Sequence, residues 1–420
     1  MKSVAYLVVM MSLLSACAST QPVIKPLAKP VAEAHPPAPM LPPLPLVLPA
    51  SVAIPPPTSS HTPLPAVTLP QPQIPLQPAN IDQARALLQQ LLPTNIKDRN
   101  GWRNDILSAF TGLKIPYEAP YFCAALAIIE QESSWQSDPS VANLDKIVWK
   151  EIEKRADKYH LPMLAVKLAL LKPSADGRSY KARIDALKTE KQMNALFEDM
   201  VADASKIGLP FEMKNPIRTG GPMQVSIDFA QSQVRAWPYP YSYKGSLRNE
   251  VFTRRGGLYF GIANLLQYRV NYPQMKYRFA DFNAGRYSSR NAAFQAALTK
   301  LTKKKLILDG DLLMYKSNQT SSTQQQLHTL APRLGMTTQA IERDLALEKS
   351  EGFNQTRLYK RVFELTEQQT GHAVAQQVMP QIQLVSPKIT RKLTTEWFAQ
   401  RVDGRYQTCM GRLPQSANLP

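Results

Sequence analysis

The stretch YFCAALAIIEQESSW, residues 121–135, decides the fold class. Its continuous apolar run predicts a buried helix over 121–134. The last turn of that helix carries the carboxyl of Glu132 beside hydrophobic side chains. Burial and the negative end of the helix dipole both disfavour a charge there, so we expect a raised pKa and a retained proton. A neutral carboxyl of this kind is what a general acid requires.

The neighbouring acid, Glu130, lies two positions earlier, about 200° around the same helix. It therefore faces elsewhere, and we expect it to be solvated or ion-paired. The same periodicity predicts further helices, and convincing strand alternation is nearly absent. These helices are expected over residues 81–92, 181–207, 257–268, 338–349, 357–377 and 388–402. The fold class is therefore mostly α.

Three later segments carry chemistry of their own: GGPMQVS (220–226), GGLYFGIANL (256–265) and FADFNAG (279–285). The glycine pair allows close backbone approach ahead of Gln224, whose amide can hydrogen-bond a sugar acetamido group. Phe282 and Asn283 offer an aromatic wall and an amide before a tight turn. Each segment also has a purely structural interpretation as a turn or core contact, and Met223 is expected in the core.

In this order the four segments resemble the lysozyme-like lytic transglycosylases. That family combines an apolar helix ending in Glu-Ser, a Gly-Leu-Met-Gln turn, a glycine-containing helix and a Tyr-Asn-Ala-Gly segment. The resemblance implies a lysozyme-like helical core with Glu132 as its single catalytic acid and base. It also implies four substrate-binding residues: Ser133, Gln224, Phe282 and Asn283.

The reaction implied by the resemblance is cleavage of the β-1,4 bond between MurNAc and GlcNAc in peptidoglycan. The products carry 1,6-anhydro rings, and the step uses no metal and no organic cofactor. Hydrolysis of the same bond is a second possibility, in which water replaces the C6 hydroxyl.

The sequence departs from the family pattern in three places. Pro222 replaces the leucine of the second motif and removes an N–H donor. Phe282 replaces the tyrosine of the fourth motif, so a hydroxyl is lost. A charged, helical insertion at about 143–216 separates Glu132 from Gln224. We expect a lysozyme-like domain over 80–300, interrupted by this insertion, and a helical C-terminal extension over 301–420.

The N-terminus has the features of an export signal. One early lysine is followed by an apolar run that is too short to span a bilayer, and residues 1–16 are expected to be a signal peptide. Residues 14–17, Leu-Ser-Ala-Cys, resemble the bacterial lipobox, which implies lipidation of Cys17 and anchoring in the outer membrane. The alternative is an ordinary signal peptide cleaved after Ala16.

A proline-rich segment follows, and residues 17–79 are expected to be a tether. Residues 21–78 hold 19 of the 36 prolines, too many to leave the backbone donors that a helix or sheet needs. A polyproline II-like spacer is predicted, which either sets the reach of the anchored domain, acts as a neutral linker, or binds a proline-recognising partner.

Composition narrows the classes of function. The chain has a formal net charge of +18, which suits an anionic polymer, and the export signal argues against nucleic acid. Five scattered histidines and three cysteines show no zinc-ligand spacing, so no metal site is expected. In an oxidising periplasm Cys123 and Cys409 are either one disulfide or two buried thiols.

The combination of lipobox, tether, interrupted core and C-terminal extension also resembles the YaiW-type outer-membrane lipoproteins. That resemblance implies an alternative function, a non-catalytic envelope lipoprotein that binds glycan or takes part in antimicrobial-peptide uptake. An envelope protein partner is left open. The two functions differ at Glu132, which an enzyme requires and a binding protein does not.

Overall fold

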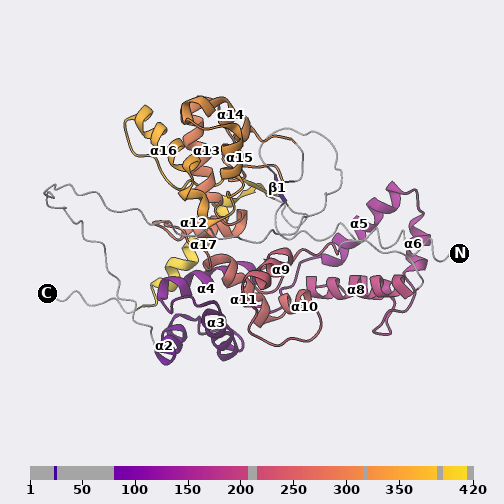
Figure 1. Ribbon diagram of the computed structural model, residues 1–420. Coiled ribbons are helices and arrows are strands. Elements are labelled where there is room, and N and C mark those ends of the chain that lie inside the picture. Colours follow the sequence, from indigo (N-terminus) through magenta and orange to yellow (C-terminus); the bar gives the residue numbers. More distant parts are fainter. Residues whose placement is uncertain (1–22, 26–79, 207–214, 316–318, 386–390, 414–420) are drawn as a thin grey trace, which may run out of the picture. The chain divides into compact units, whose positions relative to one another are not determined.

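The computed structural model describes residues 23–25, 80–206, 215–315, 319–385 and 391–413. These residues are mostly helical, which confirms the predicted fold class (Figure 1). The expected signal peptide, Cys17 and the tether beyond residue 25 lie outside them. No helix among the described residues has the length and apolar character needed to cross a bilayer.

The first hydrophobic core is built around a helix that is buried on all sides. α4 (Ala119–Ser133) has side chains from Phe122 to Ile129 that are at most 2% exposed. It contacts α2 (Ile81–Leu91), α11 (Arg254–Leu266) and α17 (Thr395–Met410), and α3 (Arg99–Leu113) packs along α11. α17 also lies against α12 (Lys276–Ala284) (Figure 1).

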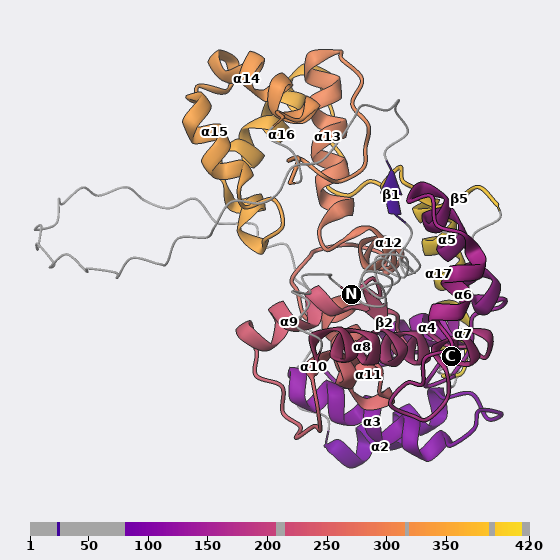
Figure 2. The ribbon, with the colours of Figure 1, turned by 90° about the vertical axis from the view of Figure 1, so that its right-hand side faces the viewer.

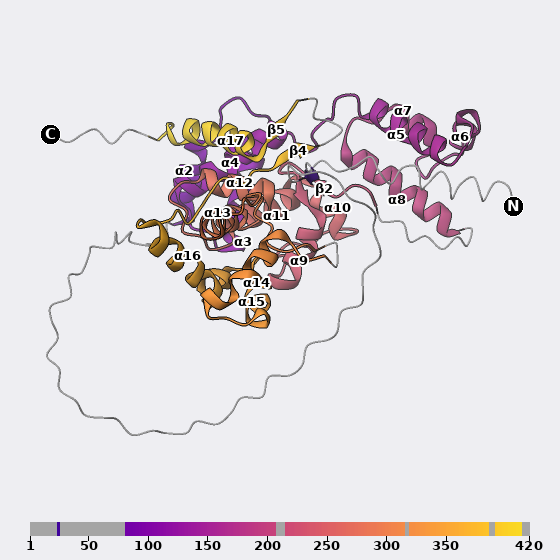
Figure 3. The same cartoon turned by 90° about the horizontal axis from the view of Figure 1, so that it is seen from above.

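Four helices follow α4, which confirms the helical character predicted for residues 143–216 as far as they are described; residues 207–214 lie outside the described residues. They are α5 (Leu144–Lys158), α6 (Met163–Ala169), α7 (Tyr180–Asp185) and α8 (Glu190–Lys206). Figure 3 shows them grouped together. The single helix expected over 181–207 is wrong, because the chain breaks between α7 and α8 at Ala186–Thr189. After the insertion come a short hairpin, β2 (Thr219–Gly220) and β3 (Val225–Ser226), and then α9 (Ile227–Ala236) and α10 (Leu247–Val251).

A second hydrophobic core gathers the helices after α12 (Figure 2). It contains α13 (Ser288–Thr302), α14 (Ser322–Leu334), α15 (Thr338–Leu345), the 3₁₀ turn η1 (Glu351–Gln355) and α16 (Arg357–Thr370). A Ser321–Gln324 capping box begins α14, and Gly371 in the left-handed region ends α16 seven residues before the predicted end.

The observed cores divide the C-terminal region differently from the predicted boundary at residue 300. The second core already begins within α13, at Ala293, and includes residues up to Val374. Phe398, Val402 and Cys409 of α17 belong to the first core instead. The reason is that α17 buries one face against α4 and α12, which no local sequence pattern reveals. Helix α17 also starts later than predicted, at Thr395, because residues Leu393–Thr394 pair as β5.

A three-stranded antiparallel sheet has the order β1–β4–β5 and joins the two ends of the described chain. β1 (Val23–Lys25) pairs with β4 (Gln383–Val385), with Ile24 opposite Leu384, and β4 pairs with β5 (Leu393–Thr394). The prediction that residues 21–78 contain no sheet is therefore wrong for Val23–Lys25. Two β-branched residues and a lysine lie between Pro22 and Pro26, which leaves three N–H donors for pairing.

Candidate active site

The carboxyls of α4 lie where its buried part ends. Ile129 is fully buried, whereas Glu130 and Glu132 are partly exposed, and Ser134 ends the helix in the left-handed conformation with φ 47°. The apolar run of the sequence therefore brings Glu132 to the boundary between core and solvent. Ser133, the next predicted site residue, is 5% exposed, and its hydroxyl donates to the carbonyl of Ile129 at 2.8 Å.

Helix α17 brings a cation to the same end of α4. Arg405 Nε lies 3.6 Å from Glu130 Oε1, so of the two states expected for Glu130, solvated or ion-paired, the structure has the ion pair. Burial and the neighbouring Arg401 lower the pKa of Arg405, while the charges of Glu130 and Glu132 oppose that shift. Arg405 therefore places a positive charge near both carboxyls. No sequence pattern indicates a role for Arg405, which lies more than 270 positions after Glu132.

A disulfide joins the same two helices. Cys123 and Cys409 are bonded, with their Cα atoms 5.5 Å apart, and both side chains are buried. Cys409 lies four positions after Arg405, so the bond and the cation share one face of α17. The disulfide thereby holds Arg405 beside the acidic end of α4.

The second motif forms the β2–β3 hairpin and packs closely on α11. A Cβ placed on Gly221 would lie 3.0 Å from Gly257 Cα, and Met223 is fully buried against Gly261. Gln224 adopts φ 49°, and its amide donates to the carbonyl of Gly221 at 3.3 Å. Gln224 therefore lies partly exposed on a turn whose shape depends on backbone-to-backbone contact.

We expect Gly221→Ala to destabilise the protein by at least about 2 kcal/mol, because a methyl group there meets backbone atoms of Val251 and Gly257 at positive φ. Gly177→Ala is the matched control, since Gly177 has φ 83° with open space around it. Chemical denaturation of both variants measures the difference. Equal losses would attribute the effect to backbone strain alone.

The fourth motif lies at the end of α12, and its two predicted ligand residues are largely engaged internally. Phe282 is 6% exposed and belongs to the first core. The Asn283 side chain is partly exposed, and its Oδ1 accepts a hydrogen bond of 2.8 Å from Thr395 Oγ1 at the start of α17. α17 thus contacts the first motif through Arg405 and the fourth through Thr395.

The four motif segments therefore share one core. α11 carries the third motif and contacts α4, α12 and β3, which carry or adjoin the other three. Among the predicted site residues, Glu132, Gln224 and Asn283 are partly exposed, whereas Ser133 and Phe282 are buried. We therefore do not expect Ser133 and Phe282 to touch a ligand in this conformation.

A buried acid with no predicted role stabilises the turn after Asn283. Asp281 is completely buried and accepts hydrogen bonds from the hydroxyls of Tyr268 and Tyr272 at 3.2 and 2.8 Å. The backbone N–H groups of Tyr287 and Ser289 donate to it at 3.1 and 2.7 Å. Burial nevertheless raises the pKa of Asp281 to about 6. The only sequence feature that could have drawn attention to Asp281 was its position inside the fourth motif.

Asp281 predicts a pH dependence of stability. The unfolded carboxyl titrates near its ordinary pKa of 3.8 and the folded one near 6, so between these values the folded state holds a proton that the unfolded state has released. Stability should therefore fall as pH rises through this window, by on the order of 3 kcal/mol. Thermal unfolding from pH 4 to 7 should show this slope reduced in Asp281→Asn. An unchanged slope would contradict the assignment.

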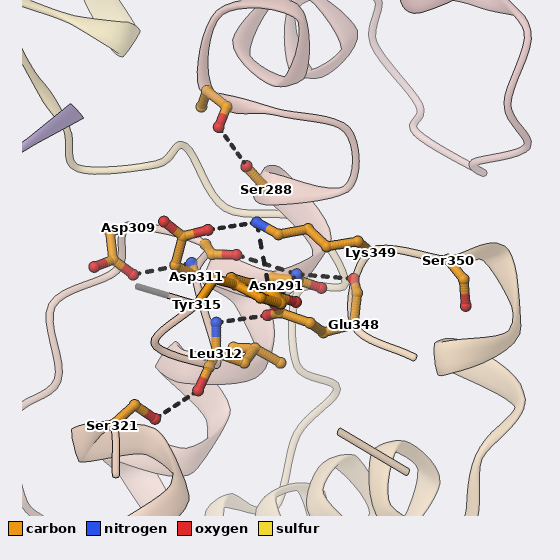
Figure 4. Close-up of polar contacts among 12 residues, drawn as sticks. Ser288, Asn291, Asp309, Asp311, Leu312, Tyr315, Ser321, Glu348, Lys349 and Ser350 are labelled. Atoms are coloured by element: carbon orange, nitrogen blue, oxygen red, sulfur yellow. Dashed lines mark hydrogen bonds and ion pairs between the residues drawn. The ribbon is translucent and has the colours of Figure 1, made fainter. Parts of the chain in front are cut away.

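The second core contains another buried carboxyl, shown in Figure 4. Glu348 is fully buried and accepts from the backbone N–H of Leu312 at 2.6 Å and from the hydroxyl of Tyr315. Asn291 Nδ2 donates to the Glu348 carbonyl at 3.1 Å, and Lys349 pairs with Asp311. Desolvation raises the pKa of Glu348. These contacts hold the 309–315 loop to α13, and we assign the cluster a structural role.

The described part of the chain has no cluster of metal-ligating side chains. No three His, Cys, Asp or Glu side chains there gather in an arrangement that would hold a metal ion. The chemistry available at the end of α4 is that of a carboxyl beside a second carboxyl and a guanidinium. That set can transfer a proton or bind a polar ligand.

Comparison with known proteins places the chain in a family. Residues 95–412 match the family described as "Protein of unknown function (DUF1615)". The chain is 45% identical over 325 residues to "Uncharacterized protein YaiW" of Escherichia coli (strain K12), an alignment that covers 77% of this chain and 89% of that relative. No solved structure matches the chain. The family match covers most of the chain, and it includes all four motif segments, the inserted helices and α17. The chain therefore belongs to the DUF1615 family and is a relative of the YaiW type.

Proposed function

We propose that the protein cleaves the glycan strands of peptidoglycan as a lytic transglycosylase with a lysozyme-like core. The observation that carries the proposal is the packing of the four motif segments around α11. The close contacts of the hairpin glycines with α11 also support the proposal. They hold the turn that carries Gln224 against the hydrophobic core to which α4 belongs. Glu132 is the proposed catalytic residue.

In the proposed reaction, Glu132 donates its proton to the oxygen of the bond between MurNAc and GlcNAc, and the C1–O bond breaks. The 2-acetamido group of MurNAc stabilises the cation that develops at C1. The ionised Glu132 then takes the proton of the C6 hydroxyl, whose oxygen bonds to C1 and closes the 1,6-anhydro ring. One carboxyl serves both halves, so no second catalytic carboxylate is needed.

Arg405 affects the two halves of this reaction in opposite directions. A positive charge near Glu132 disfavours the protonated acid that starts the reaction and favours the carboxylate that finishes it. The ion pair at 3.6 Å is made with Glu130, which is assigned no proton transfer. We infer that Glu130 neutralises much of the charge of Arg405 and so helps Glu132 to remain protonated.

The proposed setting is the cell envelope. Lipidation at Cys17 would anchor the protein to the outer membrane, and the net charge of +18 suits a polymer that carries peptide carboxylates. Peptidoglycan is therefore the proposed partner, bound through the partly exposed side chains at the ends of α4 and α12 and on the hairpin.

The proposal is tested by incubating the full chain with purified peptidoglycan sacculi and identifying the soluble products by mass spectrometry. Products with 1,6-anhydro ends are the expected result. Products heavier by one water, with reducing ends, would mean hydrolysis instead. Sacculi left intact by folded protein would exclude both reactions.

A second candidate function is glycan binding without cleavage by an envelope lipoprotein. Two contacts favour it: the Thr395 hydroxyl donates to the side-chain oxygen of Asn283, and Arg405 pairs with Glu130 at the end of α4. Pro222 in the second motif also favours binding without cleavage, because it removes a backbone N–H donor. Co-sedimentation with sacculi, unchanged by Glu132→Gln and without soluble products, would support this candidate.

A further inference from the structure

Helix α6 of the inserted group exposes a row of leucines. Leu164, Leu168 and Leu171 are 72%, 58% and 52% exposed, and their spacing of four and three residues puts them on one helical face. Leu171 lies in the turn after α6, two positions beyond Ala169, and its N–H donates to the Leu168 carbonyl at 3.1 Å. Tyr159, just before α6, is 50% exposed. Together these four residues form the α6 patch.

The opposite face of α6 already supplies its packing. Val166 and Leu170 are each 2% exposed and belong to the first hydrophobic core, and α6 contacts α5. The leucines of the α6 patch are therefore not required to hold the helix in place. Figures 1 and 3 show α6 at one end of the group formed by α5 to α8. Large apolar side chains in this position indicate an interaction surface.

The concentration of these side chains is unusual for this chain. The other strongly exposed large apolar residues of the described part are Ile81, Tyr243, Met314, Tyr315 and Leu347. Ile81 and Tyr243 are single exposed residues, which need no explanation. Met314 and Leu347 are the chain neighbours of Tyr315 and Glu348, whose side chains are hydrogen-bonded in the cluster described above. Four within the 13 positions from Tyr159 to Leu171 form a contiguous feature.

The charged residues within 158–175 are all lysines, and the exposed acids Asp157 and Asp176 flank this segment. Lys158, Lys167 and Lys172 are exposed, and residues 158–175 contain no Asp or Glu. Lys172 pairs with Asp203 of α8 at 2.9 Å. Lys167 Nζ lies 5.9 Å from the centre of the Trp149 ring. Flexible lysines beside exposed leucines are typical of helices that lie in a membrane interface, where the stems follow the apolar surface and the ammonium groups meet anionic headgroups.

The same charges argue against a second copy of the chain as the occupant. A two-fold contact through the α6 patch would bring Lys167 of both copies together, and α6 itself contains no carboxylate that could pair with it. An anionic lipid surface instead offers apolar depth for the leucines and negative charge for the lysines at once.

We propose that the α6 patch inserts into the headgroup region of a bilayer that contains anionic phospholipid. The leucines enter the boundary between headgroups and acyl chains, and the lysines remain at the phosphates. This surface contact is separate from the proposed glycan site at α4. It holds the inserted helices at a membrane independently of any lipid attached to the N-terminus.

The test uses the whole chain from residue 17, produced with Cys17→Ser so that no acyl chain is present, in vesicle flotation. Vesicles of phosphatidylethanolamine with phosphatidylglycerol should carry the protein upward, and phosphatidylcholine vesicles should carry far less. The triple variant L164D/L168D/L171D should lower the floated fraction by about tenfold or more. The matched control is I81D/Y243D/L347D, which makes the same charge change at three separated exposed positions. The control should float like the parent.

Three results would overturn the proposal: a parent that floats with neither vesicle, a parent that floats equally with both, or two triple variants that lose flotation alike. Light scattering tests the remaining alternative, that the α6 patch binds a second copy of the chain. A dimer of the parent that L164D/L168D/L171D dissociates, together with absent flotation, would assign the α6 patch to self-association instead. The outcome is independent of glycan cleavage, which the sacculus experiment measures separately.

Discussion

Glu132→Gln is expected to lower the rate of release of soluble products from sacculi by about 10²–10⁴-fold, the range that removal of a general acid commonly costs. The amide keeps the shape of the side chain but cannot donate the proton that the leaving oxygen requires. Binding to sacculi should be unchanged, because the charge and volume at this position contribute little to holding a long polymer. Initial rates and co-sedimentation measure the two effects separately.

Glu130→Gln is the matched control for that substitution. It removes a carboxyl from the same turn of α4 and breaks the ion pair with Arg405. We expect a smaller loss of rate, since Glu130 touches no reacting atom in the proposed reaction. Arg405 would then act on Glu132 alone and favour its carboxylate, so the alkaline limb of the rate profile, where the general acid loses its proton, should move to lower pH. Equal losses in the two variants would remove the special role of Glu132.

Loss of the Cys123–Cys409 disulfide is expected to have the largest effect on stability. The bond closes a loop of 286 residues, and removing such a bond commonly costs about 2–5 kcal/mol. The substitution C123A/C409A should therefore lower the free energy of unfolding by this amount and loosen α17 from α4. Denaturant titration measures the loss, and the activity on sacculi should fall with it because Arg405 and Thr395 move with α17.

A reductant separates the bond from the packing of the two buried side chains. Dithiothreitol should destabilise the parent and leave C123A/C409A unaffected. If dithiothreitol reduces the disulfide of the parent, as shown by reactive thiols, and the stability does not change, then the bond does not contribute to holding α17 on α4.

The first core could be predicted from the sequence where the information is local. The apolar run of residues 122–129 marks α4 as a buried helix, and the glycines of the second and third motifs mark the close contact of the hairpin with α11. That Glu130 does not share the direction of Glu132 also followed from its position on the helix, although its partner did not. In each case the signal lies within one turn or one loop of the residue concerned.

The parts that could not be predicted depend on contacts between distant segments. Arg405, Thr395 and Cys409 reach the site only because α17 returns to the first core after the whole second core has been made. The pairing of Val23–Lys25 with β4 likewise joins the two ends of the chain. Periodicity reports which face of a helix is buried, but it carries no information on the element that covers that face.

The burial of Asp281 could not be predicted from the sequence either. An acid within a motif that resembles a substrate site suggests a ligand contact, yet Asp281 binds two tyrosine hydroxyls and two backbone N–H groups of its own chain. Its partners lie 9 and 13 positions before it and 6 and 8 positions after it. The aromatic residues that shield it gave no separate signal, because tyrosines are common in cores and on surfaces alike.

The central claim, that Glu132 acts on a glycan bound across the four motif segments, is tested most directly by a crystal structure of Glu132→Gln with a peptidoglycan oligosaccharide. We predict a glycosidic oxygen within about 3.2 Å of the side-chain amide at position 132, and a sugar acetamido group at Gln224. An oligosaccharide bound away from the end of α4, in crystals where that end is accessible, would contradict the account.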